Sequence, residues 1–356
     1  MRPKSRNDFA IVILCALPLE ADAVESHFDE TYDRLGRYYG RQPGDANSYI
    51  NGRIGKHNVV LCYMPGSGRE SAASVLSSLR ASYTGIELVL VVGICSGAPS
   101  TPNDREIFLG DVVISNTLIE YDFGRQYPGG FQRKTGEKGI LGRSNREIQI
   151  LLNGLMADRT RSELENKMLK YLHTIQQAGT KWRCPQINDV LFNASYLHRH
   201  YKQTSSIGCC CSESGSPDNV CEDALKQNCN DLGCDKNQVI RCREPLEAPK
   251  VSVHIGTIAC ADTVMESGQH RDAISRMEGV IGFEVEGAGA WDNVPCTAIK
   301  GVCDYADSHK SKSWQAYAAA TGASAAKAFL EYWMPPNREG QYTTCPQKFV
   351  YTNICY

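Results

Sequence analysis

The chain has 356 residues, with 38 lysines and arginines against 40 aspartates and glutamates, and 42% of its residues are hydrophobic. These values are typical of a folded globular protein and exclude disorder as the default interpretation. Neither sign of charge forms a long block, so the sequence predicts no nucleic-acid partner and no membrane partner. No apolar run is long enough to span a bilayer, and a small molecule is the expected partner.

The first residues of the chain allow two interpretations. Residues 1–6 are basic and residues 9–19 are apolar, a combination that superficially resembles a secretory signal. Asp8 interrupts the basic region, and no clear small-residue cleavage pattern follows. We therefore favour a buried strand over residues 9–15, followed by a helix that begins at Pro18.

Short runs rich in valine and isoleucine alternate with helical patterns along most of the chain. This alternation is typical of an α/β fold with a mostly parallel, twisted central sheet and helices on both faces. Helices are expected over residues 71–83 and 314–333, with two more between about 145 and 201. The predicted strands are 9–15, 59–63, 88–93, 111–119, 252–259, 281–286 and 297–303.

One catalytic domain is expected over residues 1–335, because the double proline Pro335 and Pro336 ends the last helical pattern. Residues 336–356 then form a C-terminal tail. Within the domain, residues 204–247 are rich in serine, asparagine, aspartate, glycine and cysteine and lack a sustained apolar period. We interpret this segment as an insertion outside the sheet.

The chain contains 16 cysteines, and their distribution is uneven. Cysteines in strand-like stretches behave as small hydrophobic residues, so we expect a reduced, cytoplasmic protein. The insertion contains a crowd of cysteines, for which zinc, disulfides and free thiols all stay open. His198 and His200 lie upstream, but the spacing Cys229-x4-Cys234 lacks paired C-x2-C elements, and no metal site is predicted. The crowded cysteines are Cys209, Cys210, Cys211, Cys221, Cys229, Cys234 and Cys242.

Two acidic segments of the sequence, called strings below, contain the main candidate site residues. In the first, residues 282–290, alternation places Glu284 and Glu286 on one face of the strand predicted to end there. A carboxylate at the end of a buried strand is costly unless it is paired, so at least one should face a polar cavity or a ligand; a solvated strand end is the alternative.

The second string, residues 298–307, is an apolar strand that runs into an acidic turn. Lys300 and Asp304 are an even number of residues apart and should share a face. Ligands of open α/β sheets bind outside the carboxyl ends of the strands, where Asp304 and Glu286 are expected. For Asp307, a helix cap is the alternative role.

The loop over residues 65–71 follows a predicted strand and opens a helix. Its backbone N–H groups could bind an anion, and a tight turn is the equally weighted alternative. The loop spells neither a dinucleotide fingerprint nor a P-loop. A dehydrogenase is therefore disfavoured, and no organic cofactor is expected.

Four strings together resemble the motif set of the nucleoside phosphorylase and methylthioadenosine nucleosidase superfamily: residues 92–97, 109–115, 283–288 and 300–304. Residues 291–292, 300–310 and 314–315 resemble its fungal branch, which also occurs as the N-terminal module of larger immune-type receptors. The resemblance covers roughly residues 8–125 and 250–333. It implies a nucleoside phosphorylase-like fold, a purine nucleoside or nucleotide as ligand, and a homo-oligomer.

The resemblance also assigns roles to individual residues. Asp304 would protonate N7 of the departing purine, and Glu286 would hold the ribose hydroxyls. Glu20 would orient the attacking water, braced from the position of Lys300, where the family has an arginine. Bond cleavage leaves negative charge on the base and positive charge on the sugar, which a general acid and a carboxylate stabilise. Further substrate contacts are expected from Glu284, Val264, Met265, Cys95, Ser96, Gly97 and Arg69.

The resemblance favours water over phosphate as the acceptor. Phosphorylases of the bacterial hexameric type carry arginines at the positions of Glu20 and Val91 and a serine at Ile94, and all three are missing here. A first-turn glutamate that favours the helix dipole is the structural alternative for Glu20. Nucleosidases also have a serine at Ile94, so a nucleoside-binding module with little catalysis stays open, as does phosphorolysis. Arg69 could reach a 5′-phosphate, which keeps nucleotides among the expected ligands.

Overall fold

The computed structural model of the chain describes residues 2–34, 36–134, 140–202, 220, 222–245, 250–291 and 295–334, with only the backbone of 140–143. The predicted tail over residues 336–356 lies outside the described residues, as do Cys209, Cys210, Cys211, Cys221 and Asp292. In these ranges, no helix combines the length and the apolar character needed to cross a membrane.

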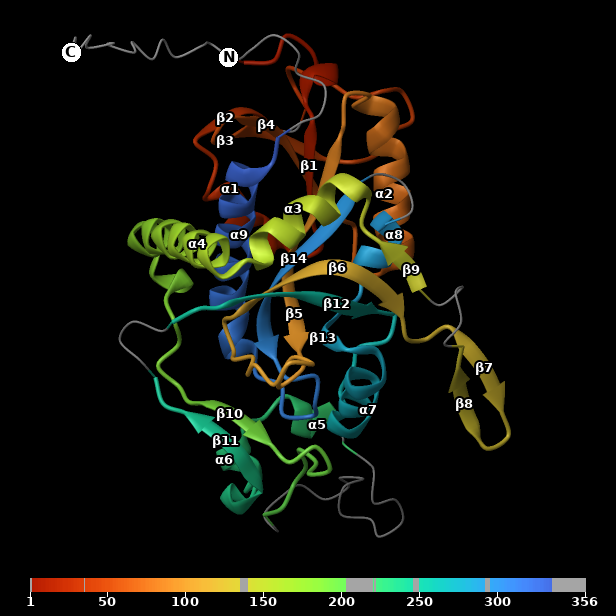
Figure 1. Ribbon diagram of the computed structural model, residues 1–356, viewed down its shortest axis with the longest axis vertical. Helices are drawn as coiled ribbons and strands as arrows, with labels where there is room; N and C mark the ends of the chain where they lie inside the picture. Colours follow the sequence, from red (N-terminus) through yellow and green to blue (C-terminus); the bar gives the residue numbers. More distant parts are fainter. Residues whose placement is uncertain are drawn as a thin grey trace, which may run out of the picture.

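A ten-stranded mixed sheet forms the centre of the molecule (Figure 1). Its order is β13-β12-β6-β14-β5-β1-β4-β3-β2, with β9 beside β6. The predicted α/β fold is confirmed, and each of the seven predicted strands has a counterpart. The strands are β1 (Ile11–Cys15), β2 (Glu30–Arg34), β3 (Tyr49–Ile54), β4 (His57–Tyr63), β5 (Leu88–Gly97), β6 (Val112–Glu120), β9 (Ile140–Arg143), β12 (Val253–Cys260), β13 (Val280–Glu284) and β14 (Cys296–Asp304).

The central strands are continuous apolar runs, which suits strands buried on both faces. β1 pairs in parallel with β4 and β5, β14 with β5, and β12 with β6 and β13. The pairs β2–β3, β3–β4, β6–β9 and β6–β14 are antiparallel. In addition, β13 pairs with the end of β5, where Gly282 lies opposite Gly97 and Phe283 opposite Ser96. This last pairing joins two strands that are far apart in the sheet order and brings their ends together.

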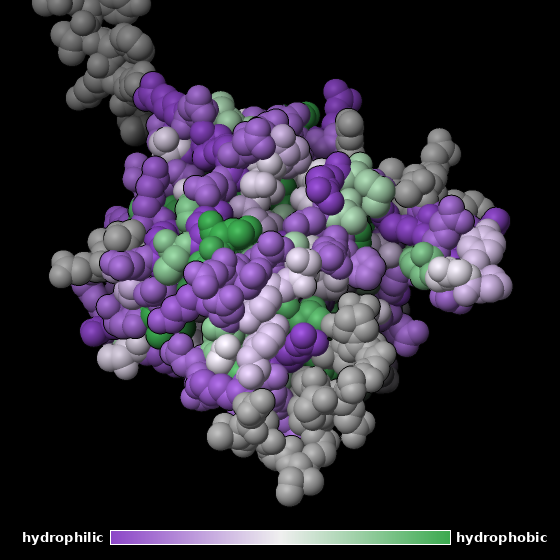
Figure 2. Space-filling view, turned by 90° about the horizontal axis from the view of Figure 1, so that it is seen from below, coloured by the Kyte–Doolittle hydropathy of each residue, from purple (hydrophilic) through white to green (hydrophobic). Residues whose placement is uncertain are grey.

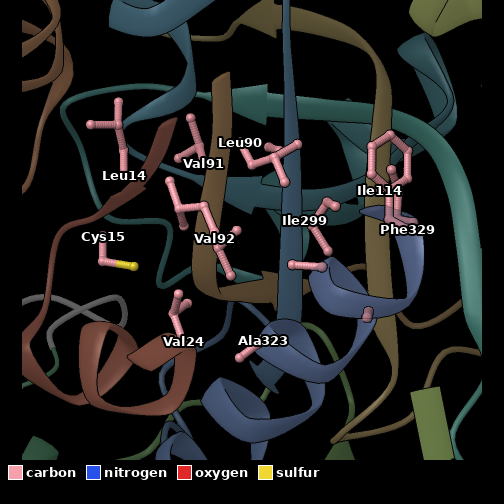
Figure 3. Close-up of a cluster of buried hydrophobic side chains, with 14 of the residues drawn as sticks. Leu14, Cys15, Val24, Leu90, Val91, Val92, Ile114, Ile299, Ala323 and Phe329 are labelled. Carbon is pink, nitrogen blue, oxygen red and sulfur yellow. The ribbon is translucent and has the colours of Figure 1, made fainter. Parts of the chain in front are cut away.

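Helices cover both sides of the sheet (Figure 1). α9 (Gln315–Tyr332) packs against β14 and β5, with α1 (Pro18–Glu25) and α4 (Asp158–Ala178) beside it, whereas α2 (Arg69–Ser82) and α8 (Gly287–Trp291) pack together on the opposite side. α9 approaches β14 closely, because a Cβ atom on Gly301 would lie 1.9 Å from the carbonyl oxygen of Ala318. In Figure 3, Val24 of α1 and Ala323 of α9 join the cluster that Val92 and Ile299 form on the strands. The remaining longer helices are α3 (Arg146–Met156) and α7 (Gly268–Glu278).

Several elements were not predicted. β2 and β3 lie at the edge of the sheet, and polar residues interrupt the apolar pattern of both. β7 (Gly124–Tyr127) and β8 (Gly130–Arg133) form a hairpin that projects from the molecule (Figure 1). β10 (Asp189–Phe192), upstream of the insertion, pairs with β11 (Val239–Arg243) inside it as a separate two-stranded sheet. The short helices are α5 (Glu222–Leu225), α6 (Cys229–Leu232) and the 3-10 turns Arg6–Asp8, Thr180–Trp182, Lys236–Gln238 and Lys312–Trp314.

The predicted end of β13 is wrong. β13 ends at Glu284, two residues before the predicted end, so Glu286 lies beyond the strand. The carboxylate of Glu284 accepts hydrogen bonds from the backbone N–H groups of Glu286 and Gly287 and so turns the chain into α8. Strand alternation therefore does not relate Glu284 to Glu286.

Candidate active site

The end of β5 lies between the two acidic strings. Lys300 on β14 pairs opposite Gly93, and Asp304 pairs opposite Ser96. Five residues of β14 thus lie opposite four residues of β5, because the register shifts between Val302 and Asp304. This irregularity breaks the alternation on which the predicted shared face of Lys300 and Asp304 rested. Pairing with a common strand, rather than alternation, brings both to the same region.

A buried lysine lies among the carboxylates of the site. The Nζ atom of Lys300 lies 2.8 Å from Oε2 of Glu286 and 3.8 Å from Oε2 of Glu284. These three residues are between 1% and 5% exposed. Glu20 is 2% exposed and within electrostatic reach of Lys300 and Glu286. We call Glu20, Glu284, Glu286 and Lys300 the Lys300 cluster. It contains three carboxylates and one ammonium group.

Burial and charge act in opposite directions in this cluster. Burial alone would lower the pKa of Lys300, but the surrounding carboxylates, Glu286 foremost, hold that pKa well above its ordinary value. Burial raises the pKa of Glu284 and of Glu20, and the charge of Lys300 opposes both shifts. Lys300 therefore stays charged, while Glu20 and Glu284 bind protons more readily than free carboxylates do.

Glu20 sits where the chain leaves β1 and enters α1. Its Oε2 atom accepts hydrogen bonds from the N–H groups of Ala16 and Leu17, both at 2.9 Å. Its Oε1 atom accepts the N–H of Ile94 at 2.8 Å. A Cβ atom on Gly93 would lie 2.0 Å from Oε1, so only glycine leaves room for this carboxylate. Glu20 thus caps its helix and also ties that helix to the end of β5.

Asp304 ends β14 in a largely buried position, with its side chain 13% exposed. Its Oδ1 atom accepts the N–H of Ala306 at 2.9 Å, and the thiol of Cys303 donates to Oδ2 at 3.4 Å. The ammonium of Lys310 lies 3.9 Å from Oδ1. Burial is also the main cause that raises the pKa of the Cys95 thiol, which is within electrostatic reach of Lys300 and Asp304. Cys95 is therefore close to both the Lys300 cluster and the predicted general acid.

Asp307 does not cap a helix, because the next helical turn begins only at Lys312. It accepts the N–H of His309 at 2.8 Å, and its Oδ2 atom lies 3.8 Å from the guanidinium of the buried Arg271. Burial raises the pKa of Asp307 to about 6, against the opposing charge of Arg271. Asp307 thus forms part of the buried turn that follows Asp304.

The loop over residues 65–71 binds a carboxylate of the protein itself. The backbone N–H of Arg69, the first residue of α2, donates to Oδ1 of Asp262 at 3.0 Å. The guanidinium of Arg69 contacts Asp262 at 2.9 Å, Asp122 at 2.8 Å and Glu120 at 2.5 Å. We call these four residues the Arg69 cluster. Its acidic members come from two distant segments, and no sequence signal linked them to Arg69.

A surface pocket of about 410 Å³ lies beside the Arg69 cluster. This volume is in the range of small-molecule sites. Val264, a predicted base contact, is 58% exposed and lines the pocket, whereas Met265 is partly buried and packs against Phe283 and its neighbours. The pocket is lined by Ser67, Gly68, Glu70, Ser71, Asp262, Val264 and Val285. Val285 lies between Glu284 and Glu286 in the chain, which places the pocket close to the Lys300 cluster.

A sequence profile described as the phosphorylase superfamily matches residues 10–157. Over these residues the chain is similar to this superfamily. Over 332 residues it is also 29% identical to a nucleotide-binding leucine-rich repeat (NLR)-like protein of Hyaloscypha variabilis. That alignment covers 91% of this chain and 29% of the relative, so the chain spans less than a third of that protein's length.

Solved structures share the fold of this chain at low sequence identity. A 5′-methylthioadenosine/S-adenosylhomocysteine nucleosidase of Streptococcus pneumoniae, with a transition-state inhibitor, is 17% identical at a TM-score of 0.52. The match covers 91% of this chain and 99% of that one. The futalosine hydrolase of Helicobacter pylori is 14% identical at a TM-score of 0.50, with 92% and 99% covered. At these identities the likeness establishes the fold.

A separate cluster in the described residues could hold a metal ion. The ligand atoms of His198, Cys229 and Cys234 all lie within 4.8 Å of one another. A hydrogen bond from Cys234 is the main cause that lowers the pKa of Cys229, to about 5. No metal site was predicted at these residues from the sequence, because the spacing of the cysteines matches no common zinc motif. What spacing could not show is that His198 folds back onto the two cysteines.

Proposed function

We propose that the chain hydrolyses the N-glycosidic bond of a purine nucleoside. The observation that carries this proposal is the Lys300 cluster, buried beside Asp304 where β5, β13 and β14 end. Excess negative charge in a buried site stabilises a sugar that becomes positive in the transition state. The superfamily and the fold of its nucleosidase members support the same chemistry.

The proposed reaction breaks one bond to C1′, forms another and transfers two protons. The bond between C1′ and N9 breaks, its electrons pass to the purine, and the carboxyl group of Asp304 gives a proton to N7. Glu286, held by Lys300 at 2.8 Å, accepts hydrogen bonds from the ribose hydroxyls and stabilises the positive ring. The oxygen of water then attacks C1′, and its proton passes to Glu20. The raised pKa of Glu20 suits a group that takes up a proton during the reaction.

The surroundings of Lys300 and Arg69, the two cations expected at the site, favour water over phosphate as the acceptor. Lys300 is enclosed by the carboxylates of its cluster, and the guanidinium of Arg69 contacts three carboxylates. Each group therefore carries a net negative charge when its members are ionised. A phosphate dianion is repelled from such a site, whereas neutral water is not.

The same reasoning favours a nucleoside over a nucleotide. The carboxylates of Glu70 and Asp262 line the pocket, and Arg69 is already paired with Asp262. A 5′-phosphate would have to displace one of these pairs, whereas an uncharged 5′ group meets no such cost. Neutral purine nucleosides are the proposed substrates.

A nucleoside-binding module without turnover is the second candidate, and Glu20 favours it. Both oxygens of Glu20 already accept backbone N–H groups, so water has to compete for the remaining lone pairs. Ile94 offers no hydroxyl to help hold that water. The NLR-like relative, of which this chain spans a part, is compatible with a sensing role. The homo-oligomer, the cytoplasmic location and the fungal branch also stay predictions.

The experiment is to incubate the purified chain with inosine, guanosine or adenosine, with and without phosphate, and to separate base, ribose and ribose 1-phosphate. We expect free base and ribose at the same rate in both conditions. Release that requires phosphate, with ribose 1-phosphate as the product, would contradict hydrolysis. Tight nucleoside binding without free base would establish the binding module instead.

A further inference from the structure

Three potential metal ligands converge where the insertion meets the body of the domain. The Nδ1 atom of His198 lies 3.7 Å from Sγ of Cys229 and 3.5 Å from Sγ of Cys234. In a tetrahedral zinc site, with Zn–S near 2.3 Å and Zn–N near 2.0 Å, a sulfur and a nitrogen ligand are about 3.6 Å apart. Both nitrogen–sulfur distances therefore already suit such an ion, and all three ligand atoms lie within 4.8 Å of one another.

The local chain builds this arrangement. Cys229 opens α6, whose cap residue Asn228 accepts the N–H of Asp231. Gly233 then adopts φ 79°, a left-handed conformation that favours glycine, and turns the chain back. The N–H of Cys234 donates to the carbonyl of Cys229 at 2.9 Å, which brings the two sulfurs to the same side. The two cysteines, which are five positions apart in the chain, thus lie close together in space.

The orientation of His198 favours metal binding. Its Nε2 atom lies 2.9 Å from the carbonyl oxygen of Gln227, which can only accept a hydrogen bond. Nε2 therefore carries a proton, and in the neutral ring the lone pair of Nδ1 faces the two sulfurs. A histidine ligand whose other nitrogen donates to a carbonyl is the usual arrangement at protein metal sites.

We propose that His198, Cys229 and Cys234 bind one Zn²⁺ ion through one imidazole nitrogen and two thiolates. Two sulfurs and a nitrogen suit zinc and exclude calcium and magnesium, which prefer oxygen. Both sulfurs bind as thiolates, any thiol proton still present is released to solvent, and no redox change is involved. The fourth position is open to water or to another donor.

The position of the site indicates what the ion does. The backbone N–H of His198 donates to Oγ of Ser308 at 2.9 Å, and its ring packs edge-on against His309 at 5.1 Å. Both partners belong to the turn that follows Asp304. The ion would therefore fasten the insertion to the chain segment behind the predicted general acid. The lower end of the molecule, where β10, β11 and α6 lie, has a mostly hydrophilic surface with scattered apolar residues (Figures 1 and 2). A small peripheral unit of this kind gains stability from a structural metal.

The test is the metal content of the full chain, purified without chelators from zinc-supplemented medium and measured by plasma mass spectrometry. We expect about one Zn²⁺ per chain and an at least ten-fold lower content in the double variant Cys229→Ser, Cys234→Ser. The matched control is Cys242→Ser, which removes an exposed thiol of β11 outside the trio and should keep the metal. Replacement by Co²⁺ should give thiolate-to-cobalt absorption in the wild type and the control but not in the double variant.

Two results would overturn the proposal. One is a wild-type chain without stoichiometric metal, in particular one in which peptide mapping finds a disulfide between Cys229 and Cys234. The other is equal metal content in the wild type and the double variant. If the double variant does not fold, chelation of the wild type decides: loss of zinc should make two further thiols, Cys229 and Cys234, available to alkylation. Unchanged alkylation of both would contradict the site.

Discussion

The Lys300 cluster and the Arg69 cluster each oppose one cation to three carboxylates, but they differ in burial. Every member of the Lys300 cluster is at most 5% exposed. In the Arg69 cluster the arginine side chain is 25% exposed and that of Asp262 is 47% exposed. The same composition of charges therefore lies in two dielectric environments within one molecule.

Burial decides what each cluster can do. Burial raises the proton affinity of Glu20 and Glu284 in the Lys300 cluster, and out of contact with water its excess negative charge attracts a positive sugar strongly. Ion pairs at the surface contribute at most about 1 kcal/mol each, because water and salt screen them. The Arg69 cluster can therefore bias which ligand enters, whereas the Lys300 cluster can drive a reaction.

Asp304→Asn should have the largest effect, because an amide keeps the shape of the side chain but cannot give a proton to the purine. We expect turnover to fall by about 10²–10⁴-fold, the usual contribution of a general acid. Nucleoside affinity, measured by calorimetry, should change little. Unchanged turnover in this variant would remove Asp304 from the mechanism.

Glu20→Gln tests whether the Lys300 cluster acts on water. We expect base release to fall by about 10²-fold or more, since the amide cannot take up the proton. Its NH₂ group would also face backbone N–H donors, which should lower the free energy of unfolding by about 1–3 kcal/mol. Chemical denaturation and single-turnover assays separate the two effects.

Asp22→Asn, an exposed position on the same helix that pairs with Lys181, is the matched control for Glu20. It should change neither measurement appreciably. If Glu20→Gln lost stability but kept full turnover, Glu20 would serve only as a cap.

Asp307→Asn tests the effect of burial beside the site. The folded chain holds the proton of Asp307 up to a pKa of about 6, against 3.8 ordinarily. The stabilisation from this proton is therefore complete below about pH 4 and is lost as the pH rises through about 6, by at most about 3 kcal/mol. The difference in unfolding free energy between wild type and variant should shift accordingly. A difference that stays constant between pH 4 and 6 would contradict this account.

Asp262→Asn should have the smallest effect, because the ion pair between Asp262 and Arg69 is exposed to solvent. Removing one negative charge beside Arg69 should improve the affinity for AMP relative to adenosine by about 2–5-fold. High salt should reduce this gain. If the variant bound AMP more weakly than the wild type, the proposed repulsion at the pocket would be wrong.

Much of this arrangement was predictable from sequence. Valine- and isoleucine-rich runs located the seven central strands, and the motifs around Glu286, Lys300 and Asp304 placed these residues at one end of the sheet. The irregular register of β14 and the early end of β13 were not predictable, because both depend on pairing with β5. The partners of Arg69 and the approach of His198 to the cysteines arise from segments far apart in the chain, which one sequence cannot relate.

The central claim is that the Lys300 cluster stabilises positive charge on the sugar. The most direct measurement is the affinity of the wild-type chain for a purine nucleoside analogue whose sugar ring carries a protonated nitrogen, compared with that for the matching neutral nucleoside. We expect the cationic analogue to bind at least about 10²-fold more tightly, as transition-state analogues do. Equal or weaker binding of the cationic analogue would contradict it.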